Sequence, residues 1–362
     1  MATHFHLLKV KDIRKETPDC ISIAFEIPDG LQPTFDFTQG QNITIKKTID
    51  GEELRRSYSI CSSPFDNELR VAVKHVAGGK FSAWANNQLK KEEWLEILPP
   101  TGKFFTALKP SNKKNYIAFV AGSGITPLLS IVKTTLLTEP YSSFTLIYGN
   151  RNRSAIIFRE TLDAIKNKFV DRFTVHHILS REKTETPLNA GRIDADKCEH
   201  IFQHLIDIKT CDEFFLCGPE EMIACVKDYL GKKAIEKNKI HFELFTTPGQ
   251  KTAASAGSKP AIKKELIGKI CKVTIKLDGI AFDFDLPYNG EAILDAALKL
   301  GTDLPFACKG GVCATCRAKL LEGKVEMDNN YALEPEELKN GFILTCQSHP
   351  RTERVVIDYD IK

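Results

Sequence analysis

Four cysteines near the C-terminus constrain this chain of 362 residues more than any other feature. Cys308, Cys313 and Cys316 are separated by four and then two residues, and Cys346 follows at a distance. This spacing is typical of plant-type [2Fe–2S] sites, in which one loop provides three thiolates and a separate segment provides the fourth. The Gly310-Gly311 pair inside the loop lets backbone N–H groups approach the sulfurs without a Cβ in the way. The spacing therefore predicts an iron–sulfur cluster held by these four cysteines.

Two other interpretations of the four cysteines are a structural zinc site and unrelated buried thiols. Zinc sites usually repeat a two-residue gap in both ligand pairs, whereas this chain has only one such gap. Seven further cysteines show no pairing pattern, which favours a reducing compartment over a secreted disulfide framework. These seven are Cys20, Cys61, Cys198, Cys211, Cys217, Cys225 and Cys271.

The composition is ordinary for a globular protein, with 42% hydrophobic and 27% charged residues, and the length predicts two or three domains. No stretch approaches the ~20 apolar residues that a membrane span requires, and the first residues do not resemble a signal peptide. We therefore expect a cytoplasmic protein with no membrane partner. The net charge of +3 does not favour nucleic acid as a partner.

Charge is unevenly distributed along the chain. From residue 267 onward there are 12 Lys and Arg against 15 Asp and Glu, so the remainder of the chain is basic. An acidic iron–sulfur module beside a basic module favours electrostatic docking during electron transfer.

Composition and hydrophobic periodicity divide the chain into three domains and a linker. Residues 246–266 are small, polar and interrupted by Pro and Gly, which is typical of a flexible linker. After it, two alternating runs flank Asp278-Gly279 and predict a β-hairpin, and a helix is expected over about 291–300. Hairpin, helix and cysteine loop indicate a β-grasp ferredoxin domain over residues 267–362.

The two domains before the linker have different patterns. Residues 109–245 alternate strands and helices, which predicts a doubly wound parallel sheet with ligands at the carboxyl ends of its strands. Residues 1–108 contain short strand-like runs and one short helix near residues 82–89, a pattern typical of an antiparallel β-barrel. The expected fold class is thus multidomain α+β.

A first candidate binding site lies in the β-rich domain. Arg56 and Tyr58 share one face of a predicted strand, where a guanidinium pairs with pyrophosphate and a phenol ring stacks on a flat cofactor. Ser57 and Ser59 add hydroxyl groups, although a surface Arg beside a half-buried Tyr is also commonplace. The segment 78–82 opens the predicted helix and offers backbone N–H groups to a pyrophosphate, unless it is only a turn and N-cap.

A second candidate site lies in the α/β domain. The sequence Gly122-Ser-Gly124-Ile-Thr126-Pro follows a strand and opens a helix, and its proline suits the first helical turn. Cys217-Gly218-Pro219 ends a later strand, where a thiol and exposed backbone could meet a nicotinamide ring. A buried cysteine that serves only packing is the alternative.

Together these motifs resemble the ferredoxin–NADP reductase superfamily, and the domain order resembles the reductase components of bacterial multicomponent oxygenases. More narrowly, RSYSICSSP, GGKFSAWANNQL and YGNRNRSAIIFRE are similar to the reductase subunits of phenylacetyl-CoA epoxidases. The resemblance implies that FAD is bound by Arg56, Ser57, Tyr58, Ser59, Lys74, Gly79, Lys80, Phe81 and Ser82. It also implies that NAD(P)H is bound by Gly122, Gly124, Cys217, Gly218 and Pro219, that Thr126 lies near the flavin, that Phe245 covers the flavin, and that Ser59 and Cys217 are catalytic.

The nicotinamide cofactor is expected to be NADPH, with NADH as the alternative. Ser180 and Arg181 end one strand of the α/β domain, and Arg151 and Arg153 end another. A hydroxyl and guanidinium groups there resemble the 2′-phosphate pocket of NADPH-using members, although solvated loop arginines have the same sequence pattern.

The sequence thus predicts an enzyme that passes electrons from NAD(P)H through FAD and a [2Fe–2S] cluster to an oxygenase. The resemblance implies a diiron oxygenase, phenylacetyl-CoA epoxidase, as the partner. Another oxygenase or desaturase system, such as a ring-hydroxylating or steroid-hydroxylating one, is the alternative acceptor. A non-catalytic redox sensor is a more remote alternative, since it leaves the flavin motifs unexplained.

Overall fold

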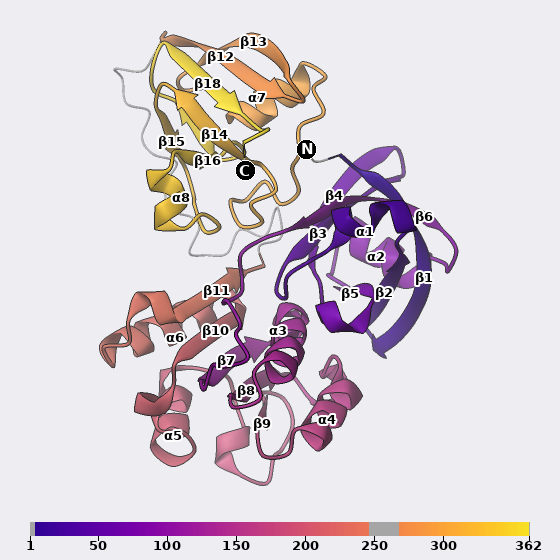
Figure 1. Cartoon of the computed structure of the whole chain (residues 1–362), viewed down its shortest axis with the longest axis vertical. Coiled ribbons are helices and arrows are strands. Elements are labelled where there is room, and N and C mark those ends of the chain that lie inside the picture. Colours follow the sequence, from indigo (N-terminus) through magenta and orange to yellow (C-terminus); the bar gives the residue numbers. More distant parts are fainter. Residues whose placement is uncertain (1–3, 246–267, 362) are drawn as a thin grey trace. The chain divides into compact units, whose positions relative to one another are not determined.

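The computed structural model describes residues 4–245 and 268–361 (Figure 1). One compact unit is built from His6–Leu54 and Tyr58–Phe245, and a second contains the C-terminal domain. The predicted linker, residues 246–266, lies outside the described residues. None of the described helices is long and apolar enough to cross a membrane.

The first domain is an antiparallel six-stranded sheet that closes on itself. Its strand order is β4-β3-β6-β1-β2-β5, and a bridge between Ile60, just after β4, and Val71 in β5 joins the two edges. The strands and helices are β1 (His6–Thr17), β2 (Cys20–Glu26), α1 (Gln32–Phe35), β3 (Asn42–Ile49), β4 (Glu52–Ser59), β5 (Leu69–Lys74), α2 (Lys80–Asn87) and β6 (Trp94–Thr101). The long hairpin of β1 and β2 was not among the predicted strands, because register shifts within β1 interrupt its alternating pattern.

The second domain is a parallel five-stranded sheet with the order β11-β10-β7-β8-β9. Its elements are β7 (Asn115–Ala121), α3 (Ile125–Thr138), β8 (Ser143–Asn150), α4 (Arg159–Lys168), β9 (Phe173–Leu179), α5 (Ala195–His204), β10 (Glu213–Gly218), α6 (Glu220–Lys232) and β11 (Ile240–Leu244). Figure 1 shows α3 and α4 on one side of this sheet and α5 and α6 on the other. The predicted doubly wound architecture is therefore confirmed.

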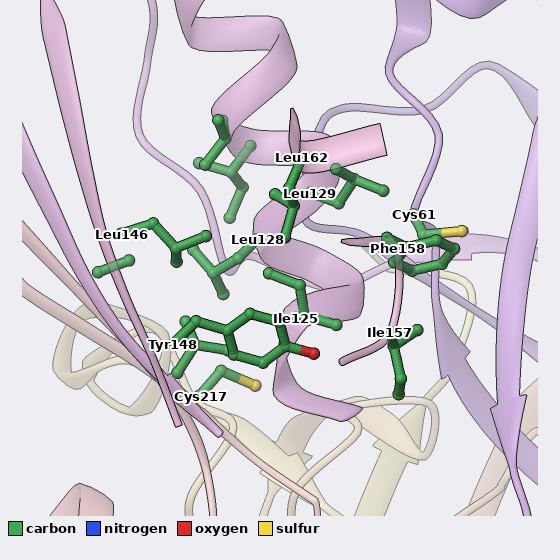
Figure 2. Packing of buried hydrophobic residues seen from close by; sticks show 14 of the residues in the cluster. Cys61, Ile125, Leu128, Leu129, Leu146, Tyr148, Ile157, Phe158, Leu162 and Cys217 are labelled. Atoms are coloured by element: carbon green, nitrogen blue, oxygen red, sulfur yellow. The ribbon is translucent and has the colours of Figure 1, made fainter. Parts of the chain in front are cut away.

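Helix α3 joins the barrel to the parallel sheet. The Ser130 hydroxyl donates to the carbonyl oxygen of Ser62 at 2.6 Å, and the hydroxyls of Ser63 and Thr134 are 2.9 Å apart. All four residues are buried. A shared hydrophobic cluster, part of which is shown in Figure 2, includes Cys61 of the barrel together with residues of α3 and the parallel sheet. The two domains are thus bonded along the same helix whose first turn forms the predicted nucleotide loop.

The C-terminal domain has a mixed five-stranded sheet with the order β13-β12-β18-β14-β16. Its elements are β12 (Ile270–Leu277), β13 (Ile280–Pro287), α7 (Ile293–Lys299), β14 (Arg317–Glu322), β15 (Val325–Met327), α8 (Pro335–Lys339), β16 (Phe342–Leu344), β17 (Ser348–Pro350) and β18 (Arg354–Asp358). The predicted hairpin is present, and Asp278 and Gly279 have φ angles of 55° and 72°. Both are in the left-handed region that a tight hairpin turn requires.

Candidate functional site

The two halves of the candidate flavin site meet at an aromatic contact. Strand β4 carries Arg56, Ser57 and Tyr58, all half-buried, and ends at the buried Ser59. The Tyr58 ring lies 5.6 Å, centroid to centroid, from the ring of Phe81 in the first turn of α2. The structure therefore brings the tyrosine strand and the predicted pyrophosphate segment together, as a dinucleotide that contacts both would require.

Helix α2 begins directly after Gly79, as expected for a pyrophosphate seat. Among the described residues no side chain caps its first turn, and no acidic residue lies in that turn. Ser82 instead braces the preceding loop, because its hydroxyl accepts from the backbone N–H of Val76 at 3.0 Å and donates to the carbonyl of Gly79 at 3.1 Å. The first-turn N–H groups and the positive helix end suit a phosphate anion.

The two lysines predicted at the flavin site both have carboxylate partners. Lys80 is exposed and paired with Glu52 of β4, while the ammonium of Lys74 lies 3.7 Å from a carboxylate oxygen of Asp19. Their predicted contacts with FAD would require these pairs to exchange, which costs little because solvent screens ion pairs at the surface.

The loop after β7 packs tightly on the end of β10. Gly122 has a φ of 55°, and a Cβ at Gly124 would lie 2.2 Å from the carbonyl oxygen of Cys217. Only glycine permits this close approach, which places the predicted nucleotide loop beside the predicted nicotinamide cysteine. The Thr126 hydroxyl donates to the carbonyl of Ser123 at 3.0 Å and so helps to fix the start of α3.

Cys217 is fully buried at the carboxyl end of β10, and α6 begins just after Gly218 and Pro219. Burial, together with the neighbouring carboxyl of Glu243, raises the pKa of its thiol. The thiol therefore stays protonated at neutral pH. Figure 2 shows Cys217 with Tyr148 and Ile125 in the cluster under the first turn of α3.

Glu243 is a candidate site residue that the sequence analysis missed. It lies in β11, in register with Cys217 of β10, and its carboxylate accepts a hydrogen bond from the Ser59 hydroxyl at 3.1 Å. Burial raises the pKa of this carboxyl to about 7, although the bond from Ser59 opposes the change. Glu243 therefore stands beside both predicted catalytic residues, in register with Cys217 and hydrogen-bonded to Ser59. Phe245 follows β11 and is 41% exposed, so its ring is accessible to a ligand at this end of the sheet.

The carboxyl ends of β8 and β9 bring the predicted 2′-phosphate residues together. The backbone N–H of Arg181 donates to the carbonyl of Arg151 at 2.8 Å, and that of Ser180 donates to the carbonyl of Asn150 at 2.9 Å. The side chains of Arg151, Ser180 and Arg181 are all exposed. The neighbouring Arg153 differs, because its Nε forms an ion pair with the Glu182 carboxylate at 3.1 Å.

One buried donor at this edge has no partner. The Asn150 side chain is 8% exposed, and its Nδ2 makes no hydrogen bond to any described residue. Leaving a buried amide unpaired costs about 1–3 kcal/mol, and a ligand bound at this edge would supply an acceptor for it. The residues at the strand ends thus fit a pyridine dinucleotide.

Backbone geometry in the cysteine loop turns N–H groups toward sulfur. The N–H of Gly310 points to the Cys308 sulfur at 3.3 Å, and the N–H of Cys308 points to the Cys313 sulfur at 3.5 Å. Lys309 and Ala314, each directly after a cysteine, have positive φ angles of 51° and 55°. Non-glycine residues in this region are strained, and such strain is concentrated at functional sites.

The four sulfurs are arranged as two pairs. A hydrogen bond from Cys313, supported by backbone N–H groups, lowers the pKa of Cys308 to about 6, and a bond from Cys316 lowers the pKa of Cys346. Four thiols gathered as two pairs supply the number and type of ligands that a [2Fe–2S] cluster requires.

Comparison with known proteins matches three parts of the chain to family models. A family model described as "Oxidoreductase FAD-binding domain" matches residues 7–106, and one described as "Oxidoreductase NAD-binding domain" matches residues 119–228. A third, "2Fe-2S iron-sulfur cluster binding domain", matches residues 275–351. The cofactor classes are therefore FAD, a pyridine nucleotide and a [2Fe–2S] cluster, and the protein is an oxidoreductase.

Full-length relatives have the same organisation. The chain is 43% identical to a subunit of 1,2-phenylacetyl-CoA epoxidase from Escherichia coli K12, over 99% of both chains. It is 33% identical to the ferredoxin reductase component of 3-ketosteroid-9-alpha-monooxygenase from Rhodococcus rhodochrous, over 98% of this chain and 96% of the relative. Phthalate dioxygenase reductase shares the fold, with a TM-score of 0.59, 23% identity and 98% coverage of both chains. The chain therefore belongs to the family of three-domain reductases that combine an FAD-binding domain, an NAD-binding domain and a C-terminal 2Fe–2S domain, the family that includes this 1,2-phenylacetyl-CoA epoxidase component.

Proposed function

We propose that this protein transfers electrons from NADPH to the oxygenase part of a diiron phenylacetyl-CoA epoxidase. The observation that carries this proposal is the 43% identity to the epoxidase component from Escherichia coli K12 over 99% of both chains. Identity to the 3-ketosteroid monooxygenase component is ten percentage points lower over a similar length. The relatives named as oxygenase reductase components support an oxygenase as the electron acceptor.

The proposed roles at the flavin site follow from the donors that β4 and α2 present. Arg56 and the first turn of α2 bind the pyrophosphate, Tyr58 stacks on the flat ring system, and Ser57 contributes a hydroxyl. Bound FAD and the [2Fe–2S] cluster together supply the conversion of a two-electron donor into single electrons. The polypeptide supplies binding, orientation and exclusion of water.

Ser59, Cys217 and Glu243 form the proposed catalytic group around the nicotinamide. Because the thiol of Cys217 stays neutral, it offers a small, apolar contact rather than a charge that would compete for the ring. The carboxyl pKa of about 7 at Glu243 means that the proton shared with Ser59 is gained and lost near neutral pH. We infer that Glu243 acts by setting whether the Ser59 hydroxyl donates to the carboxylate or toward the flavin.

The preference for NADPH is proposed from the charges at the ends of β8 and β9. Within residues 4–245, neither Arg151 nor Arg181 has an ion-pair partner, whereas Arg153 is bound by Glu182. Two exposed guanidinium groups beside the Ser180 hydroxyl form an anion site that a 2′-phosphate would fill and NADH would leave empty.

The four cysteines of the C-terminal domain are the proposed cluster ligands. Cys313, Cys316 and Cys346 are buried and Cys308 is half-buried, so one edge of the bound cluster would remain near the surface of this domain. An electron acceptor needs such an accessible edge, and the excess of acidic residues after residue 267 favours a basic partner surface.

The test is NADPH oxidation by the purified protein mixed with the oxygenase subunits of phenylacetyl-CoA epoxidase, with and without phenylacetyl-CoA. We expect substrate-dependent NADPH consumption together with epoxide formation. A parallel reaction with the oxygenase component of 3-ketosteroid-9-alpha-monooxygenase and its steroid is the matched control. Turnover of the steroid without turnover of phenylacetyl-CoA would reject the proposed partner while leaving the electron-transfer function in place.

A further inference from the structure

Gln347, the residue after the last cluster cysteine, has a neutral amide buried among three segments of the C-terminal domain. The side chain is 8% exposed. Its Nε2 donates to the carbonyl of Lys309 in the cysteine loop at 2.9 Å, and its Oε1 accepts from Nδ2 of Asn329 at 3.2 Å. The amide therefore links the cysteine loop, the segment after β15 and the turn between β16 and β17 that carries Cys346.

The same Nε2 faces the Cys346 sulfur. It lies 3.7 Å from that sulfur, within the longer reach that sulfur acceptors allow, and 2.9 Å from the Cys346 carbonyl oxygen. An amide nitrogen has two hydrogens, so one can serve Lys309 while the other points at Cys346. The donor is a neutral side-chain amide.

Gln347 also packs directly on the strained part of the loop. Gly311 has a φ of 77°, and a Cβ there would lie 3.2 Å from Cγ of Gln347 and 2.9 Å from the carbonyl oxygen of Asn329. The carbonyl of Gly311 accepts from the backbone N–H of Tyr331 at 3.0 Å. The loop is thus held between Gln347 and the 329–331 segment, and only glycine fits between them.

We propose that Gln347 is a positioning residue that holds the cysteine loop against Cys346 and, through Nε2, raises the reduction potential of the bound [2Fe–2S] cluster. The inference rests on the proposed ligation of the cluster by the four cysteines. Hydrogen bonds to cluster sulfurs stabilise the more negative, reduced state, and partners outside the ligand set fix the geometry of the ligands. In the described C-terminal residues, no other side-chain nitrogen is hydrogen-bonded to a sulfur of the four cysteines.

Two substitutions separate these effects from a loss of folding. Gln347→Glu keeps the shape but replaces the donor with a carboxylate oxygen facing the Lys309 carbonyl and the Cys346 sulfur. Gln347→Met keeps the volume and removes the donor without adding charge. Asn330→Ala is the matched control, because that neighbouring amide also makes two hydrogen bonds, but both go to Leu333.

The measurements are iron content, the visible and EPR spectra of the cluster, and its midpoint potential by redox titration. At a fixed potential we expect the ratio of reduced to oxidised cluster to fall about tenfold in Gln347→Glu, equivalent to a shift of about 59 mV for one electron, and to fall less in Gln347→Met. Loss of iron from both variants, with Asn330→Ala fully loaded, would support the positioning role. Variants with full iron and unchanged potential would overturn the proposal, whereas absence of a cluster spectrum from the wild-type protein would instead reject the ligation itself.

Discussion

The iron–sulfur domain and the flavin–nucleotide unit build their sites in opposite ways. Three of the four proposed cluster ligands lie within nine residues of one loop, whose backbone turns N–H groups toward the sulfurs. The proposed catalytic group of the other unit is assembled from the ends of three distant strands, with Ser59 and Glu243 separated by 184 residues. A local site depends on one loop conformation, whereas a distributed site depends on how two domains are joined.

The largest expected effect comes from removing one cluster ligand. In Cys316→Ser we expect electron transfer to the oxygenase to fall to background, while NADPH-dependent reduction of ferricyanide, which the flavin can serve alone, stays within about twofold of wild type. Cys225→Ser, a partly exposed cysteine in α6, is the control and should keep both activities. Loss of both activities in Cys316→Ser would show that the two sites are not separable, and the contrast between a local and a distributed site would fail.

The distributed site should be disrupted by one added carbon atom where the nucleotide loop packs on β10. In Gly124→Ala the added Cβ would lie 2.2 Å from the Cys217 carbonyl oxygen, so the nucleotide loop must move away from β10. Because a displacement of about 1 Å at a reacting centre costs on the order of 100-fold in rate, we expect ferricyanide reduction by NADPH to fall by that factor with FAD still bound. Stopped-flow measurement of flavin reduction checks the expectation.

The matched control for this variant is Gly231→Ala in α6, where an added Cβ would meet no atom within 4 Å. It should reduce flavin at the wild-type rate. Normal flavin reduction in Gly124→Ala would mean that the nicotinamide does not bind between this loop and Cys217.

The same contrast explains what could be predicted from the sequence. The cysteine loop, the β-hairpin around Asp278-Gly279 and the alternation of strands and helices in the α/β domain are local patterns, and the structure contains all three elements. Glu243 could not be found by spacing, because its partner Ser59 is in another domain. The available signal was an acidic residue between Phe242 and Leu244 in an otherwise apolar strand end, where an unpaired charge is costly.

Element ends were harder to place than element types. Helix α2 begins at Lys80, two residues before the predicted start, because Gly79 forms the N-cap through its backbone alone. Side-chain caps are the usual sequence signal of a helix start, and here there is none. The contacts of Gln347 are likewise invisible in the sequence, since they depend on three segments that meet only in the folded domain.

A moderate effect on nucleotide binding is expected at the exposed ends of β8 and β9. In Arg181→Ala we expect the KM for NADPH to rise about tenfold with kcat nearly unchanged, because one charge-assisted hydrogen bond contributes about 1.5–3 kcal/mol. NADH lacks the 2′-phosphate and is the internal control, so its KM should not change. Equal increases for both nucleotides would assign Arg181 to general binding and would remove the argument for NADPH preference.

The smallest expected effect concerns the proton at Glu243 and is measured through the pH dependence of stability. Burial raises the carboxyl pKa to about 7 in the folded protein, above the ordinary value of 4.5 that applies when the chain unfolds. The protonated carboxyl therefore favours folding at pH 4.5 and below, and that stability is lost as the pH rises from about 4.5 through 7. Glu243→Gln carries no titrating proton, so its melting temperature relative to wild type should be higher at pH 8 than at pH 4.5, by a few degrees if about 1 kcal/mol is recovered.

Thermal unfolding at the two pH values tests this expectation, with Glu236→Gln as a control on an exposed carboxyl. A difference that is the same at both pH values would mean that Glu243 is ionised in the folded protein, and the Ser59–Glu243 pair would then hold Ser59 in place without exchanging a proton near neutral pH.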